Sequence, residues 1–212
     1  METVVILFVA VYGLFFGSLS LVVSRRYMDG RNWWSGRSEC ESCQHRLGIL
    51  ELIPLASFLW QKGRCKYCRV KLENSYWLVE LFSAITAALI YVLWPFKLLD
   101  IQDWLAFGLF NLLTLVLMIL ALIDFKHKVL PTPLVQLAFL IILSLLLTFW
   151  AGGHNISDSA VRALSGALVG GGPFFILYQV SDGKWIGGGD VRLGAVLGLS
   201  LIHISEPTRH AS

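Results

Sequence analysis

Long uncharged stretches constrain this chain more than any other feature. Four of them have 18 to 22 residues each, at positions 4–23, 104–123, 129–150 and 163–180. A helix of about 20 residues crosses the hydrocarbon core of a bilayer. A fifth run at 81–96 has 16 residues and reaches spanning length if 77–79 and a snorkelling Glu80 are added. Only 15% of the residues are charged, whereas a soluble domain is about one-quarter charged, so the sequence predicts an integral membrane protein.

The expected fold is an all-α polytopic bundle of about six transmembrane helices with a small zinc-ribbon-like cytoplasmic insertion. The sixth helix begins near Val191, but its apolar run stops at Ile202 and is followed by HISEPTRHAS. We interpret this ending as a non-native tail on a truncated sequence, with a short re-entrant end as the alternative. The expected parts are a first transmembrane helix at 1–23, a cysteine loop domain at 24–76, a membrane core at 77–202 and the tail at 203–212.

Positive charge gathers in the segment after the first apolar run. Ten of the 17 Lys and Arg residues lie between positions 24 and 76. Cytoplasmic loops carry the excess of Lys and Arg, so this segment is expected inside the cell and the N-terminus outside. Alternation of sides then puts both 124–128 and 181–190 on the cytoplasmic face. Because orientation accounts for the charges, nucleic acid is not an expected partner.

All four cysteines lie in this cytoplasmic segment. They form two Cys-x-x-Cys pairs, Cys40 with Cys43 and Cys65 with Cys68, separated by 21 residues. This is the spacing of a zinc ribbon, in which each pair supplies two thiolates to a closed, structural, tetrahedral site. Free or redox-active thiols are the alternative, although a reducing cytoplasm disfavours disulfides. His45 is a further candidate that could replace one thiolate.

Between the two cysteine pairs lies LGILELIPLASFLW, an apolar stretch of 14 residues that contains Glu51 and Pro54. It is too short and too interrupted to span a membrane. It can form an interfacial helix against the bilayer, or it can line a groove for a peptide or a small molecule. The sequence leaves both interpretations open.

Two aspartates stand at ends of apolar runs that are both expected at the cytoplasmic boundary of the membrane. Asp124 closes the third span in LALIDFKHKVLP, and Asp190 opens the sixth in GGGDVRL. Antiparallel helices can bring two such carboxyls face to face, where they share a proton and act as general base and general acid on a peptide bond. The glycines at 187–189 would let the backbone approach a substrate strand closely. The alternatives are interfacial capping aspartates, a proton or cation relay in a transporter, and a non-catalytic anchor with a partner-binding zinc loop.

Five motifs together resemble one family. They are FGSLSLVVSRR at 16–26, the two cysteine pairs, ELIPLASFLWQKGRCKYCRVKLENSYWLVEL at 51–81, LIDFKHKVLP at 122–131 and GGGDVRLGAVLG at 187–198. In this order they resemble the type IV prepilin leader peptidases of bacterial type IV pilus and competence systems, which are GxGD aspartyl membrane proteases. The sequence departs from the family pattern at Ser20 and Thr132, and in the membrane helices that the family carries after GxGD.

The resemblance implies an aspartic-type endopeptidase in the bacterial inner membrane. Its substrates would be pilin-like precursors, cut at the cytoplasmic face to remove the basic leader. Carried over by position, Asp124 and Asp190 are the catalytic pair, Glu80 is a supporting residue, and the four cysteines are zinc ligands. Many members also methylate the new N-terminus with S-adenosylmethionine, so this second activity is an expectation that the resemblance leaves open.

Overall fold

The chain folds into helices, as the apolar runs predict. The computed structural model describes residues 2–32, 36–40, 42–73, 75–94, 98, 100–151, 156–182, 184–185 and 187–202, and over these residues it contains no strand. The predicted non-native tail at 203–212 lies outside the described residues. The chain divides into two compact units, Met1–Leu93 and Trp94–Ser212, each of which is described by itself.

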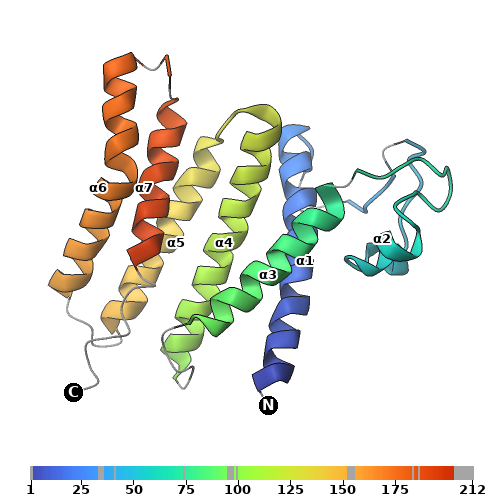
Figure 1. Ribbon diagram of the computed structural model, residues 1–212, viewed down its shortest axis with the longest axis horizontal. Helices are drawn as coiled ribbons and strands as arrows, with labels where there is room; N and C mark the ends of the chain where they lie inside the picture. Colours follow the sequence, from blue (N-terminus) through green and yellow to red (C-terminus); the bar gives the residue numbers. More distant parts are fainter. Residues whose placement is uncertain are drawn as a thin grey trace. The chain divides into compact units, whose positions relative to one another are not determined.

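The first unit is built on two packed helices, α1 (Glu2–Met28) and α3 (Ser75–Val92), with η1 (Ile49–Leu52) and α2 (Ala56–Trp60) in the segment between them (Figure 1). Small residues let α1 and α3 approach closely. A Cβ atom on Gly13 would lie 2.7 Å from the Ser83 carbonyl oxygen, and one on Gly17 would lie 2.8 Å from the Cα atom of Glu80. The Gly13/Gly17 spacing is therefore a helix-packing motif, as GxxxG patterns are in membrane helices.

The second unit contains four helices: α4 (Ile101–His127), α5 (Thr132–Ala151), α6 (Ile156–Ser181) and α7 (Gly188–Ile202). Helix α5 packs against both α4 and α7, and α7 packs against α6. The α4–α5 and α6–α7 connections lie at the same end of the unit (Figure 1). Its core is apolar, and the largest fully buried side chains come from α4 and α5: Leu113, Leu120, Ile123, Ile142 and Leu145.

Helices α6 and α7 meet through glycines. A Cβ atom on Gly170 would collide with the Gly194 carbonyl oxygen, and one on Gly198 would collide with the Gly166 carbonyl oxygen. Side chains at these positions would force the two backbones apart. The Gly166/Gly170 spacing thus packs two membrane helices, and it fixes where α7 begins relative to α6.

This contact predicts different changes in the free energy of unfolding when two nearby glycines of α6 are replaced by alanine. Gly170→Ala is expected to lower the free energy of unfolding by about 1–3 kcal/mol, the usual cost of overpacking. Gly172→Ala is the matched control, because nothing lies within 4 Å of a Cβ atom there. That change should be neutral or raise stability by up to about 1 kcal/mol through helix propensity. Thermal unfolding of both variants in the same detergent checks the pair, and equal effects would contradict the close α6–α7 contact.

Four helical segments are long and apolar enough to cross a membrane: Glu2–Met28, Ser75–Val92, Ile101–His127 and Leu164–Ser181. The apolar part of α5 at Thr132–Thr148 is shorter, and α7 has 15 residues. These helices confirm the prediction of a polytopic α-helical membrane protein. The exposed apolar side chains along α1, α3 and α6 are the surface that lipid would cover.

Candidate active site and metal centre

Asp124 lies in the last turn of α4, where its backbone carbonyl accepts a hydrogen bond of 2.8 Å from the N–H of Lys128. Lys128 has left-handed backbone angles and ends the helix. The carboxylate is half-buried and has no hydrogen bond or ion pair among the described residues. A helix C-terminus disfavours negative charge, so this position gives the carboxylate no structural purpose.

Asp190 lies in the first turn of α7, the opposite kind of helix end. Its Oδ2 atom accepts a hydrogen bond of 3.0 Å from the backbone N–H of Gly187, and its own N–H donates to the Gly187 carbonyl oxygen at 3.0 Å. The carboxylate thus caps its own helix, where the dipole favours negative charge. Asp190 is half-buried and not fully enclosed, so capping leaves it able to meet a water or a substrate.

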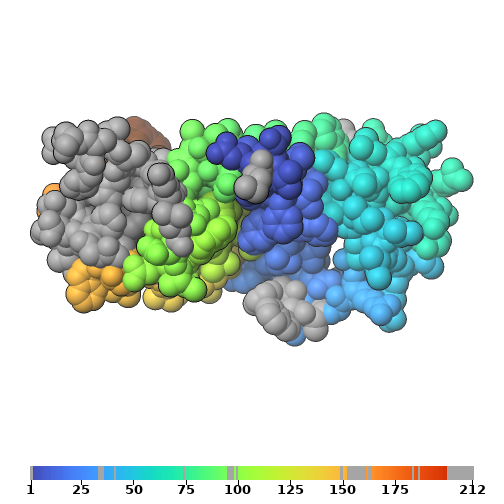
Figure 2. Space-filling view, turned by 90° about the horizontal axis from the view of Figure 1, so that it is seen from below, coloured from blue at the N-terminus to red at the C-terminus, as the bar shows by residue number. Residues whose placement is uncertain are grey.

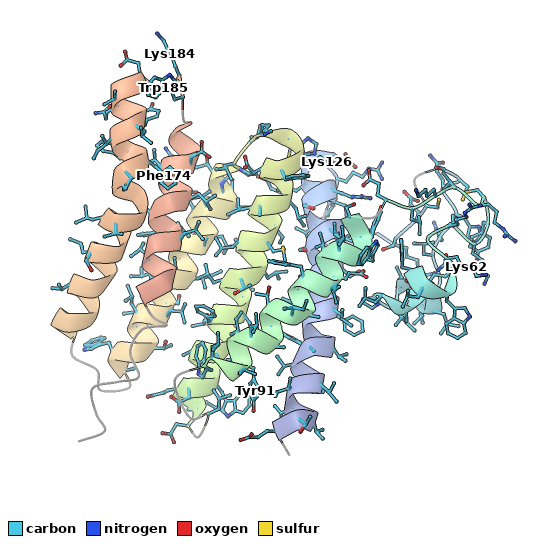
Figure 3. All side chains as sticks on the ribbon, in the orientation of Figure 1. Lys62, Tyr91, Lys126, Phe174, Lys184 and Trp185 are labelled. Atoms are coloured by element: carbon cyan, nitrogen blue, oxygen red, sulfur yellow. The ribbon has the colours of Figure 1, made fainter. Side chains whose placement is uncertain are left out.

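The turn before Asp190 touches the connection that follows Asp124. A Cβ atom on Gly189 would lie 3.1 Å from the side chain of Leu130, in the α4–α5 connection. Figure 3 shows Lys126 at the end of α4, and Lys184 and Trp185 in the α6–α7 connection, all at the same end of the second unit. The structure therefore brings the two aspartate-bearing helix ends to one end of one unit, with α5 between α4 and α7.

The three glycines before Asp190 differ in their surroundings. Gly189 is half-buried under Leu130, whereas Gly187 and Gly188 are exposed. A Cβ atom on Gly188 would make only an ordinary contact, 3.8 Å from the Tyr178 ring. Close packing thus explains Gly189. Gly187 uses both its N–H and its carbonyl oxygen in hydrogen bonds with Asp190, and Gly188 is exposed at the start of α7.

The first unit gathers the four cysteines into one cluster. Their Sγ atoms all lie within 4.8 Å of one another, and the Sγ atoms of Cys40 and Cys68 are 3.8 Å apart. A tetrahedral site with zinc–sulfur bonds of about 2.3 Å requires sulfur–sulfur separations of about 3.8 Å. The four thiols therefore fit a metal ion that prefers sulfur ligands. His45 is not a member of the cluster, and its ring stacks on that of Tyr67 with the centroids 3.5 Å apart.

The two cysteine pairs have the same backbone geometry. In the first, the N–H of Gln44 donates to the Cys40 carbonyl oxygen at 2.8 Å. In the second, the N–H of Arg69 donates to the Cys65 carbonyl oxygen at 3.0 Å. Gln44 and Arg69 both have positive φ angles, 54° and 60°, which are uncommon for residues with side chains. Two equivalent tight turns thus hold the thiols in place.

The two thiols of the second cysteine pair differ in their pKa values. The backbone N–H of Cys68 lowers the pKa of Cys65 to about 7. The N–H of Val70 lowers the pKa of Cys68, but desolvation and the neighbouring thiols outweigh it and raise that pKa to about 11. The cluster thus does not ionise fully by itself near neutral pH. A bound divalent cation would stabilise all four thiolates together.

Glu80 links α3 to the loop segment. Its side chain is buried, and its Oε2 atom accepts a hydrogen bond of 2.8 Å from the backbone N–H of Leu55, which precedes α2. Leu55 has a positive φ of 57°, so the carboxylate holds an uncommon backbone conformation. The carboxylate is buried within the unit and bound to the loop segment, so it does not lie on the outer surface of α3. A catalytic role for Glu80 stays a prediction.

Removing this carboxylate should loosen α2 selectively. In Glu80→Ala the Leu55 N–H loses its partner at a part-buried site, which typically costs about 1–3 kcal/mol. Hydrogen exchange at residues 55–58 is expected to speed up while exchange in α4 and α5 is unchanged. Glu80→Gln is the control, because its amide oxygen can accept the same hydrogen bond. Equal protection of 55–58 in the parent and the alanine variant would contradict this role.

Sequence reasoning missed two residues that close the loop. Arg25, near the end of α1, forms an ion pair of 3.0 Å with Glu73, and its guanidinium lies 4.2 Å from the centroid of the Tyr76 ring. Arg26 donates hydrogen bonds to the carbonyl oxygens of Gly36 and Arg37. The distribution of Lys and Arg in the sequence assigns these arginines only to the cytoplasmic side of the membrane. Their adjacency in the sequence at a helix end was the available signal, but it named no partner.

Together these features describe a polytopic helical membrane protein with a cluster of four cysteines that could hold a metal ion, and two aspartates at one end of a helical unit. Two family models match it. Residues 11–94 match the bacterial peptidase A24 N-terminal domain, and residues 111–204 match the type IV leader peptidase family. The second match includes both Asp124 and Asp190.

Curated relatives agree with these matches. A prepilin leader peptidase/N-methyltransferase of Bacillus subtilis is 32% identical over 195 residues, which cover 90% of this chain and 71% of the relative. One from Aeromonas salmonicida is 34% identical over 164 residues, covering 76% and 53% of the two chains. A type 4 prepilin-like proteins leader peptide-processing enzyme of Escherichia coli is 32% identical over 186 residues, covering 81% and 61%.

The chain belongs to the type IV leader peptidase family. It spans 53% to 55% of the length of several relatives, including those from Aeromonas salmonicida and Stutzerimonas stutzeri. No solved structure matches the chain.

Proposed function

We propose that the chain is a membrane-embedded aspartyl endopeptidase that removes the basic leader of type IV prepilin-like precursors. The observation that carries this proposal is the position of the two aspartates. Both stand at one end of a single packed unit, within the region that matches the type IV leader peptidase family. A transporter would place its carboxyls near the membrane midplane, which gives the transport alternative less support.

In the proposed reaction, one aspartate is ionised and the other is protonated. The ionised carboxylate takes a proton from a water molecule as its oxygen attacks the scissile carbonyl carbon, while the protonated carboxyl donates its proton to the carbonyl oxygen. As the tetrahedral intermediate collapses, the carboxyl that took the proton from water gives it to the leaving nitrogen, the other carboxylate takes a proton from a hydroxyl of the intermediate, and the carbon–nitrogen bond breaks. No covalent enzyme intermediate forms.

The exposed turn at Gly187 and Gly188 provides the substrate-binding element of the proposal. A carbonyl oxygen of the precursor can accept a hydrogen bond from the Gly188 N–H, which begins α7 and has no acceptor within the helix. A precursor inserted by its own apolar helix reaches this site by lateral diffusion. In the proposed topology the N-terminus is outside, and the cysteine loop and both aspartates face the cytoplasm, in keeping with the ten basic residues at 24–76.

The metal proposed for the four cysteines is zinc, in a structural role. Cys40, Cys43, Cys65 and Cys68 would occupy all four tetrahedral positions and leave none for water, so the ion would brace the loop and take no part in hydrolysis. N-methylation of the new N-terminus is proposed as a second activity, for which S-adenosylmethionine would supply the methyl group. We assign no residue to that cofactor.

The test is cleavage of a prepilin-like precursor by the chain in proteoliposomes. Mass spectrometry is expected to show a released basic leader and a mature product with a free N-terminus. The same vesicles, loaded with a pH-sensitive dye, test the transport alternative. An intact precursor together with proton flux that requires Asp124 and Asp190 would overturn the peptidase proposal.

A further inference from the structure

The cysteine loop carries large apolar side chains that its own fold does not bury. Ile49 and Leu50 of η1 are 86% and 76% exposed, and Leu59 and Trp60 of α2 are 74% and 86% exposed. The two short helices contact each other, so the four residues belong to one small substructure. We call these four residues the loop patch. Exposed patches of this kind mark an interaction surface, because leaving such side chains in water is costly.

Contacts with α3 fix the depth of this substructure. The Leu55 N–H donates to Glu80, and the Phe58 ring lies 6.4 Å from the Trp77 ring. Glu80 is five residues into α3, or about 7 Å along the helix axis at 1.5 Å per residue. The 18 residues of α3 span about 27 Å, which is no more than the hydrocarbon core itself. Helix α2 therefore lies beside a part of α3 that must already be at the bilayer boundary.

In Figure 1, α2 is drawn to the side of the α1 and α3 helix pair, lower in the view than the first turn of α3. Figure 2 shows atoms of the loop segment beside those of α1. The loop segment thus stands beside the two spanning helices of its own unit, where lipid is the nearest large apolar phase.

Charge next to the loop patch complements a membrane surface. Lys62 lies two residues after the end of α2, near that helix in Figure 3, and Arg64 is exposed two residues further on. Three further exposed cations follow at Lys66, Arg69 and Lys71. Basic residues beside apolar ones are typical of segments that lie in the interface of a membrane containing anionic lipids. Trp60 fits the same position, because tryptophan is enriched at headgroup depth.

We propose that the loop patch inserts into the bilayer leaflet nearest the end of α1 and the start of α3. The neighbouring lysines and arginines then contact anionic headgroups. The occupant of this surface is lipid. The metal-braced loop then has a membrane contact of its own, in addition to its two covalent connections. This inference does not depend on peptidase activity.

Fluorine NMR of the full chain in nanodiscs tests the proposal. With 5-fluorotryptophan in place of tryptophan, Trp60→Phe identifies the Trp60 resonance as the one that disappears. A spin label near the lipid headgroups is expected to remove most of the Trp60 signal, whereas a water-soluble gadolinium chelate should leave it nearly intact. The opposite pattern would overturn the proposal. Protection from both reagents would do the same, because Trp60 would then be covered by protein.

Two variants sharpen the test. Ile49→Glu places a charge within the loop patch and should expose the Trp60 signal to gadolinium, with the other tryptophan signals unchanged as the folding control. Lys62→Gln should keep Trp60 in the lipid. Anionic lipid should, however, add less protection of Trp60 from gadolinium, relative to neutral lipid, than it adds in the parent. A Trp60 that is exposed in empty nanodiscs and protected only after a prepilin-like precursor is added would identify a peptide groove and exclude the lipid contact.

Discussion

Replacing either Asp124 or Asp190 by asparagine is expected to lower the rate of precursor cleavage by roughly 10²- to 10⁴-fold, the range that one general acid or base contributes. Asparagine keeps the size of the side chain but can neither take a proton from water nor donate one as a carboxyl does. The measurement is the single-turnover rate of leader release in proteoliposomes. The same loss of rate is expected in both variants, because the proposed reaction needs one base and one acid.

Asp182→Asn is the matched control for this experiment. Asp182 is exposed in the α6–α7 connection and has a positive φ of 49°, which asparagine also tolerates. Cleavage by this variant should equal that of the parent. The double variant of Asp124 and Asp190 should lose little more than each single one, because residues that act as a unit are not additive. Full activity in either single variant would remove that residue from the catalytic pair.

Losing one thiol of the metal centre is expected to unfold the cysteine loop. A structural zinc site contributes an apparent 10–16 kcal/mol, roughly, to the folding of small domains, and much of this is lost when one of four ligands is removed. Cys65→Ser should therefore lower bound zinc from one equivalent to nearly none. The four helices of the second unit should keep their helical content. Elemental analysis of the purified chain and limited proteolysis within 36–73 measure the two effects.

His45→Ala is the control for the metal centre. Its ring packs on Tyr67 and lies outside the thiol cluster, so this variant should keep its zinc and its resistance to protease. A strong chelator should reproduce the proteolysis of Cys65→Ser in the parent chain. Zinc loss in His45→Ala with full occupancy in Cys65→Ser would contradict the four-cysteine ligand set.

Local patterns predicted those features that depend on spacing alone. The apolar runs predicted helices because their lengths match a bilayer, and the structure has a helix over each of them. The two cysteine pairs predicted a cluster because four thiols at zinc-ribbon spacing have few other uses in a reducing compartment. The glycine spacings at Gly13/Gly17 and Gly166/Gly170 are too common by chance in glycine-rich spans to predict a contact, and it is the structure that shows them packed against α3 and α7.

Features that depend on a distant partner could not be predicted in this way. No sequence signal connects Glu80 to the backbone of Leu55, because backbone N–H groups are the same in every residue. The contact of Gly189 with Leu130 arises from the order in which α4, α5 and α7 pack, which periodicity does not determine. Asp124 and Asp190 were identified by residue type and helix end. Their common place at one end of a unit required the fold.

The clasp formed by Arg25 with Glu73 and Tyr76 has a consequence for how such a chain can change during evolution. Because it joins the end of α1 to the start of α3, the segment 29–74 leaves and re-enters the helix pair at nearly the same place. The helix pair is held together by its own glycine contacts, which make no use of that segment. The length of the chain between 29 and 72 can therefore vary at exposed positions while the Arg25–Glu73 ion pair and the glycine contacts keep the geometry of the helix pair.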